Sequence, residues 1–310
     1  GLQISGSSQE PNTKWPSYNI IKNCDAYDNA DYKANDADGF AAKLTSGVGN
    51  IFEGCISHHN IDDGWDLYAK STTGSIGDVI IRNCVTYANG FLSENARLKG
   101  QLLGKDEGEG NGFKLGGESM PGRHLLINSI SFGNGAKGVT SNSGPDCRVQ
   151  YVTSYGNATF GGAESISLYT NTASSTNYEA DGIISMSPVS GKVDKLDVKK
   201  QDPLYSETNY FFDGTKSVNI SGEEATEDWF VSVDTTILPT RNEDGSINMH
   251  GLLELTDAAP SNAGGRLEAV VSTYPEVPAA IKDKIIIDDN NNNDNNNDNN
   301  HNNYQDDDSD

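Results

Sequence analysis

A short segment recurs through the first half of the chain. Four segments read alike and a looser fifth follows them: NCDAYDN (23–29), GCISHHN (54–60), NCVTYAN (83–89), NSISFGN (128–134) and YVTSYGN (151–157). Their closing asparagines are separated by 31, 29, 45 and 23 residues. Repetition at such a period is typical of a solenoid, in which each repeat packs only against its neighbours.

The repeating unit favours short strands over helices. Each segment is too short and too rich in glycine, asparagine and β-branched residues for a helical repeat, and its apolar residues alternate as strands require. We therefore predict an all-β fold, a right-handed parallel β-helix, with coils of about 23 residues stacked at roughly 4.8 Å. Equivalent positions of successive coils would then form ladders.

The repeat also predicts how the chain is organised. Residues 1–165 should form the coils that carry the function, and residues 166–287 the last coils and an irregular C-terminal cap of the same domain. Residues 288–310 are almost wholly asparagine and aspartate and cannot bury a core, so we expect a disordered tail or linker. The first residues look like a coil already in progress, so we expect N-terminal coils to be missing from this sequence.

Two ladders have simple structural interpretations. Cys24, Cys55 and Cys84 occupy one position in successive coils, and Ser129 comes next. A metal or redox cluster is the alternative, but no CxxC motif or histidine partner accompanies them, so a stack of small buried side chains is favoured. The closing asparagines are interpreted as turn residues that tolerate unusual backbone angles.

Composition limits the partners. Lys and Arg total 22 against 45 Asp and Glu, a formal charge of -23, which argues against nucleic acid and anionic membranes as partners. The sequence has no apolar stretch of about 18 residues, so no membrane span is expected. The first residues lack the basic and apolar regions of a signal peptide. Either the protein is cytosolic or this sequence begins after an export signal.

A second pattern follows each of the first four segments: DGFAAKL (38–44), DGWDLYA (63–69), NGFKLGG (111–117) and KGVTSNS (137–143). Between the closing asparagine and the glycine of this pattern, two coils carry insertions of 6 and 19 residues. Both insertions should lie at the same corner of the solenoid. Insertions on one face usually build the binding face of such a fold.

Alignment on that glycine predicts which side chains meet. The residue after the glycine is bulky and apolar and should point inward, so its neighbours should point outward. Asp38 should then lie one coil below Asp63, and Lys114 one coil above Asp66. Asp62 should lie beside them at the turn.

Carboxylates that meet on one outer face predict a cation site. The four residues are Asp38, Asp62, Asp63 and Asp66. They offer oxygen ligands only, which suits a hard cation, and Ca²⁺ tolerates an irregular geometry best. Zinc would prefer histidine, but the nearby His58 and His59 fall in the turn ladder. A calcium ion that only ties two coils together is the structural alternative.

Lys114 favours catalysis over a purely structural cation site. A divalent cation disfavours a nearby ammonium group and lowers the pKa of the lysine, as a general base requires. Lys43 lies four positions after its glycine and could hold an anionic substrate, or it could be an ordinary surface lysine. Tyr68 occupies the equivalent position of the next coil.

Three motifs resemble those of polysaccharide lyase family 9, the pectate lyases with a β-helix fold: DADGFAAKL, HHNIDDGWDLYAK and GNGFKLGG. The resemblance covers roughly residues 18–165. It implies that the four aspartates bind calcium and that Lys114 is the Brønsted base. It further implies β-elimination of α-1,4-linked polygalacturonate (pectate) to 4,5-unsaturated products by a secreted monomer that binds neither nucleic acid nor membrane. From their place on the outward ladder, we expect Lys43 and Tyr68 to contact the substrate.

Two other classes of function are compatible with the same residues. A glycoside hydrolase on a similar β-helix would use paired aspartates as acid and base, which leaves Lys114 without a role. A calcium-dependent carbohydrate-binding solenoid would bind the polysaccharide without turnover.

Deletion of residues 288–310 should leave the melting temperature and the activity unaltered, because a run of asparagine and aspartate buries no apolar surface. Thermal unfolding of the full and shortened chains checks this expectation. A clearly lower melting temperature of the shortened chain would show that these residues pack against the domain.

Overall fold

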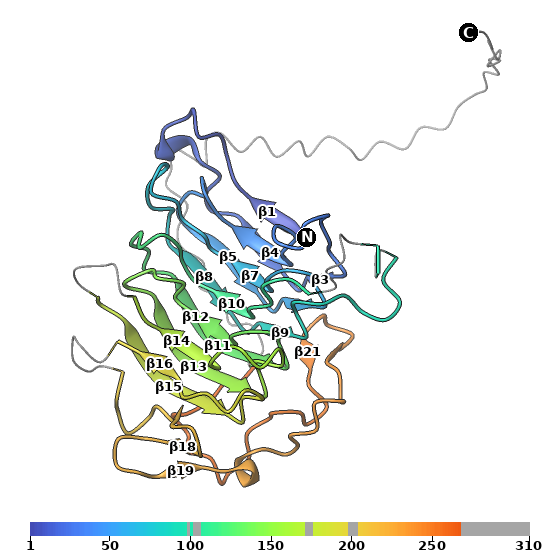
Figure 1. The fold of residues 1–310 in the computed structure, drawn as a ribbon, viewed down its shortest axis with the longest axis vertical. Helices are drawn as coiled ribbons and strands as arrows, with labels where there is room; N and C mark the ends of the chain where they lie inside the picture. The colour runs from blue at the N-terminus through green and yellow to red at the C-terminus, as the bar shows by residue number, and fades with distance from the viewer. Residues whose placement is uncertain (98–99, 102–106, 171–175, 198–203, 268–310) are drawn as a thin grey trace, which may run out of the picture. The chain divides into compact units, whose positions relative to one another are not determined.

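The computed structural model describes residues 1–97, 100–101, 107–170, 176–197 and 204–267. These residues form a right-handed parallel β-helix, which confirms the predicted fold class (Figure 1). The helical segments Asn12–Lys14 and Glu227–Trp229 are single 3₁₀ turns. Within the described residues, no helix has the length and apolar character to cross a membrane.

The first sheet takes one strand from each coil, and all its pairings are parallel. Its strands follow one another in chain order: β1 (Leu2–Ile4), β4 (Phe40–Ala42), β7 (Trp65–Asp66), β10 (Phe113–Lys114), β12 (Val139–Thr140), β14 (Ile166–Leu168) and β16 (Lys195–Leu196). Figure 1 shows them from blue to yellow across the molecule. The repeat therefore continues beyond residue 165.

The second sheet forms the other walls of each coil. Its early coils contribute two short strands each: β2 (Ile20–Lys22) and β3 (Asp25–Tyr27), β5 (Asn50–Glu53) and β6 (Ile56–His58), β8 (Val79–Arg82) and β9 (Val85–Tyr87). In later coils single strands of eight residues replace these pairs: β11 (Leu125–Phe132), β13 (Arg148–Tyr155) and β15 (Glu179–Met186). The backbone bends between the two halves at residues with positive φ, such as Asn83 and Asn128.

The interior of the coils is a stack of equivalent side chains. The Trp65 ring lies between those of Phe40 and Phe113, at centroid distances of 4.9 and 5.0 Å. On another wall, the Cys55 backbone N–H donates to Cys84 Sγ at 3.4 Å. Cys55, Cys84 and Ser129 are fully buried, which confirms a stack of small side chains, whereas Cys24 is exposed. All four cysteines are free thiols.

The closing asparagines form a buried ladder of amide groups. Asn60 donates to Asn89 Oδ1 from its backbone N–H at 3.2 Å and from its side-chain Nδ2 at 2.9 Å. Asn89 makes the same pair of hydrogen bonds to Asn134 Oδ1. The interpretation of these asparagines as residues with unusual backbone angles is wrong, because the positive φ falls one residue earlier, at positions such as His59 and Ala88.

The glycine of the second pattern packs against this ladder. A Cβ added to Gly64 would lie 2.6 Å from the carbonyl oxygen of Gly112 and 2.9 Å from Asn89 Nδ2. The same crowding surrounds Gly39 and Gly138. Glycine is therefore required here for close approach of neighbouring backbones rather than for a left-handed conformation.

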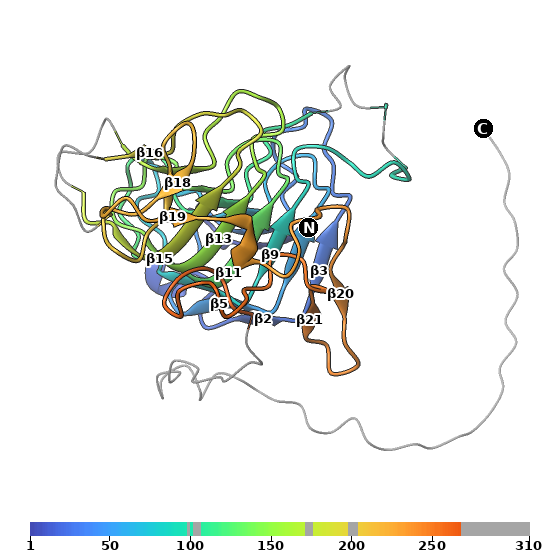
Figure 2. The ribbon, with the colours of Figure 1, turned by 90° about the horizontal axis from the view of Figure 1, so that it is seen from below.

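Residues 204–267 close the end of the coil stack and then return along its side. A small antiparallel sheet follows the last coil: β17 (Phe211–Phe212), β18 (Ser217–Val218) and β19 (Glu224–Ala225). Trp229, Leu252 and Leu253 then pack outside the second sheet in one apolar cluster. The hairpin of β20 (Thr240–Arg241) and β21 (Ile247–Asn248) lies beside β3, where Arg241 forms an ion pair with Asp25 (Figure 2). The predicted tail at 288–310 is outside the described residues.

Replacement of Asn89 by leucine should destabilise the protein by about 2–4 kcal/mol, because a buried amide without a partner costs about 1–3 kcal/mol. The substitution removes the acceptor for two donors of Asn60 and the donor to Asn134. Asn35→Leu, at an exposed position, is the matched control. Thermal and denaturant unfolding measure the difference, and equal stability of the two variants would contradict a stabilising ladder.

Candidate functional site

The site lies on the outer face of the first sheet, where three coils pair in register. Asp66 in β7 pairs with Ala41 in β4 on one side and with Lys114 in β10 on the other. Trp65 points into the core between Phe40 and Phe113, so Asp66 and Lys114 point outward. These pairings are the ones that the glycine alignment predicted, and they are confirmed.

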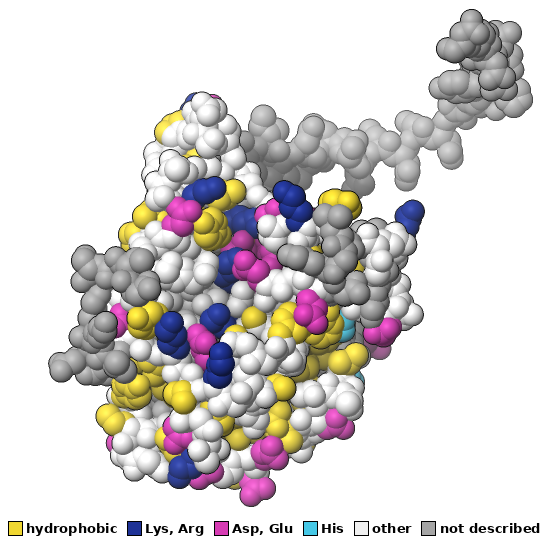
Figure 3. All heavy atoms as spheres, in the orientation of Figure 1, with side chains coloured by type: hydrophobic (Ala, Val, Ile, Leu, Met, Phe, Trp, Pro, Cys, Tyr) yellow, Lys and Arg dark blue, Asp and Glu magenta, His cyan; other side chains and the backbone are white. Residues whose placement is uncertain are grey.

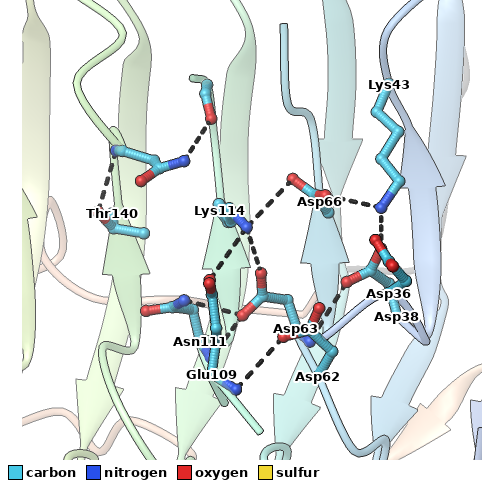
Figure 4. A network of polar contacts seen from close by, with 12 residues as sticks. Asp36, Asp38, Lys43, Asp62, Asp63, Asp66, Glu109, Asn111, Lys114 and Thr140 are labelled. Carbon is cyan, nitrogen blue, oxygen red and sulfur yellow. Dashed lines mark hydrogen bonds and ion pairs between the residues drawn. The ribbon is translucent and has the colours of Figure 1, made fainter. Parts of the chain in front are cut away.

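The four predicted cation ligands come together. Asp38 precedes β4, Asp62 and Asp63 lie in the corner between β6 and β7, and Asp66 lies in β7. Although they lie on the outer side of the sheet, their residues are only 6%, 2%, 0% and 3% exposed. Carboxylate oxygens of Asp38, Asp63 and Asp66 lie within 4.8 Å of one another, and those of Asp62 and Asp63 do so together with Glu109. Figure 4 shows how these side chains converge.

Lys114 is the centre of the ion pairs. Its Nζ lies 2.9 Å from Asp63 Oδ2, 3.2 Å from Glu109 Oε2 and 3.8 Å from Asp66 Oδ1. Lys114 is only 8% exposed. Its ammonium group also lies 5.8 Å from the centre of the Tyr68 ring. Lys114 is thus held against the carboxylates from one side and against an aromatic ring from another.

Lys43 lies within the carboxylate cluster. Its Nζ donates to Asp38 Oδ2 at 2.6 Å and to Asp66 Oδ2 at 3.0 Å (Figure 4). Sequence reasoning gave it a place beside the substrate, and the structure places it between two of the predicted cation ligands. Figure 3 shows acidic side chains between basic ones on this face, over β4, β7 and β10.

The carboxyl groups of the cluster resist ionisation. Burial, Asp66 and Asp63 together raise the pKa of Asp38 to about 7. Burial, Asp63 and Asp38 raise the pKa of Asp62 to about 9. Burial is also the main cause of a raised pKa at Asp66. Negative charge is therefore concentrated here beyond what the neighbouring lysines neutralise.

The pKa values of the two lysines are raised as well, which favours their charged forms. Burial alone would lower the pKa of Lys114, but Asp63, Asp66 and Glu109 outweigh it and raise the pKa above its ordinary value. Burial is likewise outweighed at Lys43, where Asp66 and Asp38 raise the pKa. In this arrangement, without added positive charge, both lysines are ammonium ions at neutral pH.

The donor set fits a hard divalent cation. Two lysines face five carboxylates, those of Asp38, Asp62, Asp63, Asp66 and Glu109. With all groups ionised, this leaves an excess of three negative charges. In addition, Asp66 Oδ1 is buried and accepts no hydrogen bond from the described residues. Oxygen ligands, excess negative charge and a buried oxygen that accepts no hydrogen bond from the described residues all suit a calcium site.

Histidine takes no part in this cluster. His58 is stacked between the rings of Tyr27 and Tyr87, at centroid distances of 5.0 and 4.7 Å. Both clusters of possible ligands that the described residues form consist of carboxylates alone. The zinc alternative therefore lacks a histidine ligand in the described part of the chain.

The two insertions lie over the aspartate coil. They lie within residues 28–39 and the described part of residues 88–112. Ala34 and Leu92 pack with Ile61 in a small apolar cluster. The two segments are also joined by Ser93, whose backbone N–H and Oγ donate to the carboxylate of Asp28 at 2.8 and 2.7 Å. The loops thus meet directly beside the carboxylates.

Sequence reasoning missed three polar residues of the site. Glu109 pairs with Lys114, and its backbone N–H donates to Asp62 Oδ1 at 3.3 Å. Asn111 was aligned with Asp63 by sequence, but its contacts were not foreseen: its backbone N–H and its Nδ2 each donate to Asp63 Oδ1 at 2.8 Å. An acidic residue at the end of the longer insertion, immediately before the lysine strand, was the available signal for Glu109.

Glu118 is the third residue that was missed. Its carboxylate accepts hydrogen bonds from the Tyr68 hydroxyl at 2.7 Å and from Ser71 Oγ at 2.6 Å. These bonds, from Ser71 first and then Tyr68, lower the pKa of Glu118 to about 2. The Tyr68 hydroxyl is thereby fixed, while its ring remains next to Lys114.

Known proteins with a similar sequence and fold share this architecture. The family model described as "Pel9A-like, right handed beta helix region" matches residues 1–177. A pectate lyase L of Thermoclostridium stercorarium is 48% identical over 74% of this chain and 17% of that protein. A pectate lyase L of Paenibacillus polymyxa (strain SC2) is 37% identical over 82% of this chain and 52% of that protein.

Similarity extends to a solved structure. The crystal structure of pectate lyase Pel9A superposes with a TM-score of 0.61 and 29% sequence identity, over 83% of this chain and 56% of that one. The chain thus spans about half the length of this structure and of the Paenibacillus relative, and less of the Thermoclostridium relative.

In the presence of a chelator, the protein should become less stable as the pH rises from about 6 to about 9. Asp38 and Asp62 have folded-state pKa values of about 7 and about 9, above the unfolded value near 4. Their contribution to stability is fully present below the unfolded pKa and is lost as the pH rises through the folded pKa. Melting temperatures across this range, with chelator and with calcium, measure the effect.

Calcium should reduce this loss of stability because it replaces the protons as the neutralising charge. Asp62→Asn should make the melting temperature in chelator less dependent on pH, since the amide does not ionise. A melting temperature that rises with pH in chelator would contradict the assigned charge balance.

Proposed function

The chain belongs to the Pel9A-like right-handed β-helix family, and on this basis we propose that it is a calcium-dependent lyase that cleaves α-1,4-linked polygalacturonate by β-elimination. One observation carries the proposal: Lys114 Nζ lies 2.9 Å from Asp63 in a cluster of carboxylates with excess negative charge. A site in which a lysine is paired with a cluster of carboxylates can supply both a base and, with a cation bound, a binding place for an anionic sugar.

The similar proteins support the choice of reaction and substrate. Two relatives carry the name pectate lyase L, and the similar solved structure is a pectate lyase. Pectate is a polymer of uronic acids, so each of its sugars carries a carboxylate. A chain with a net charge of -23 needs local positive charge to bind it. Bound calcium and the two lysines supply that charge in this proposal.

The carboxylates of Asp38, Asp62, Asp63 and Asp66 would hold the calcium. When bound, it would neutralise these groups and withdraw electron density from the substrate carboxylate, which acidifies the proton on C5. The fit rests on the oxygen-only donor set and on the buried Asp66 Oδ1 that accepts no hydrogen bond from the described residues.

Lys114 is the base in the proposed reaction. Its pKa is raised because Asp63, Asp66 and Glu109 face it, so it can act as a base only when the charge of these carboxylates is neutralised. Neutral Nζ then accepts the C5 proton of the uronate. The C5–H electron pair forms the C4–C5 double bond, the bond between C4 and the glycosidic oxygen breaks, and this oxygen takes a proton from water.

Lys43 and Tyr68 complete the proposed site. Lys43 Nζ lies at the edge of the cluster, between Asp38 and Asp66, and is close enough to pair with a uronate carboxylate once calcium satisfies these aspartates. The Tyr68 ring, held by Glu118, offers a flat apolar surface to a sugar ring. Because the proposed substrate is an extracellular polymer, we expect a secreted enzyme. We also expect it to act as a monomer.

Lys114→Ala should lower the turnover of polygalacturonate by at least about a hundredfold, since a positioned base contributes about 10²–10⁴-fold. Lys114→Arg should fail similarly, because guanidinium does not deprotonate in proteins. Lys216→Ala is the matched control, since the one ion pair of this lysine with a described residue is to the half-exposed Glu224. The ultraviolet absorbance of the unsaturated product measures the rate.

The same assay separates the alternatives. Chelation should abolish turnover, and calcium should restore it. New reducing ends without unsaturated product would indicate a hydrolase. Binding of polygalacturonate without any product would indicate a carbohydrate-binding solenoid. Near-native activity of either Lys114 variant would require another residue as the base.

A further inference from the structure

A second pair of lysine and tyrosine lies on the outer face of the same sheet. Lys195 Nζ in β16 is 4.1 Å from the centre of the Tyr169 ring. At the candidate site, Lys114 Nζ is 5.8 Å from the centre of the Tyr68 ring. In both pairs the tyrosine belongs to the preceding coil and follows, by two positions, the residue that pairs with the lysine. The Lys195 pair therefore repeats the relative positions of lysine and tyrosine in the first pair.

The two lysines stand on one straight ladder. Lys114 pairs with Thr140, Thr140 with Ser167, and Ser167 with Lys195. Three strand spacings separate the two lysines, which is about 14 Å. Figure 4 shows Thr140 on the strand next to Lys114. Because only two short hydroxyl side chains lie between the lysines, an extended chain can lie across β12 and β14 without meeting a long side chain.

The neighbouring ladder continues the same surface. Gly116 lies beside Asn142, whose Nδ2 donates to the Gly116 carbonyl at 3.0 Å. Gly116 and Asn142 belong to the two coils that lie between the coil of Tyr68 and the coil of Tyr169. Thr140 and Ser167 are only 5% and 6% exposed, and Asn142 is half-buried. The tyrosine rings thus flank a surface to which these residues contribute short polar side chains rather than bulky ones. A polysaccharide chain matches such a surface better than an apolar partner does.

The charge of Lys195 is available to a ligand. Unlike Lys114, Lys195 is exposed, and among the described residues no carboxylate forms an ion pair with it. A lysine ammonium has three donors, so contact with the Tyr169 ring leaves donors for an incoming carboxylate. Figure 3 shows basic side chains on this face over β14 and β16, with an acidic side chain between them.

We propose that Lys195 and Tyr169 form a second uronate-binding subsite, which holds the same polygalacturonate chain several sugars away from the bond that is cleaved. This inference rests on the proposed function and adds to it a direction for the substrate, along the ladder from β10 to β16. Lys195 pairs with the carboxylate of one sugar, and the Tyr169 ring packs against the sugar itself. Long chains therefore bind better than short ones.

Lys195→Ala should raise the KM for polygalacturonate about threefold to tenfold and leave kcat within about twofold, because an exposed charged contact contributes modestly to binding. The KM for trigalacturonate should rise less than that for polygalacturonate, because a trimer is only about as long as three strand spacings and reaches Lys195 only when its end sugar lies at Lys114. Tyr169→Ala should act in the same way as Lys195→Ala, and Lys195→Arg should retain most of the affinity.

Lys192→Ala is the matched control. Lys192 is an exposed lysine of the same coil, and its Nζ donates to the Gly162 carbonyl at 2.6 Å. A rise in KM of the same size in the Lys192 variant would overturn the subsite in favour of a general effect of charge. An unchanged KM of Lys195→Ala for polygalacturonate, or an equal rise for trigalacturonate, would also overturn it. If the unaltered chain cleaves no polygalacturonate, the proposed function fails, and this inference fails with it.

Discussion

The asparagine ladder fixes the register on which the rest of the molecule depends. Each Oδ1 in the series accepts both the backbone and the side-chain donor of the preceding asparagine, as between Asn60 and Asn89. Neighbouring glycines, such as Gly64, leave no room for a Cβ, so the backbones at this corner are in close contact. A slip of one residue would break these bonds and turn Asp66 into the core in place of Trp65. The candidate site directly follows the corner that carries the asparagine ladder, where a slip in strand register would be most costly.

That rigidity allows the fold to hold a charge cluster that is unfavourable by itself. Burial, and then repulsion from Asp63 and Asp38, raise the pKa of Asp62 to about 9. Asp63 accepts two hydrogen bonds from Asn111 and pairs with Lys114. Stability gained along the coils offsets local repulsion that a cation can relieve, as is common at functional sites.

Periodicity predicted those parts of the structure that repeat. The pairing of Asp66 with Lys114 follows from their equal distance from the glycine of each pattern, because stacked coils place equivalent residues side by side. It could not show that Lys43 reaches back between Asp38 and Asp66, since the reach of a long side chain is not periodic. Nor could it show the return of the C-terminal segment to Asp25, which depends on packing between segments about 200 residues apart in sequence.

The solenoid also explains how one surface can hold several chemically different groups in line. Each coil offers one residue at the same outward position, and the ladder contains aspartate, lysine, threonine, serine and lysine in turn. A change at one position alters a single point of the surface, because the corner ladder, and not this residue, maintains the register. A linear polymer that lies along the ladder meets these groups one after another at the strand spacing. The fold therefore suits a row of separate contacts to such a polymer, and the carboxylates of the candidate site gather on three neighbouring coils.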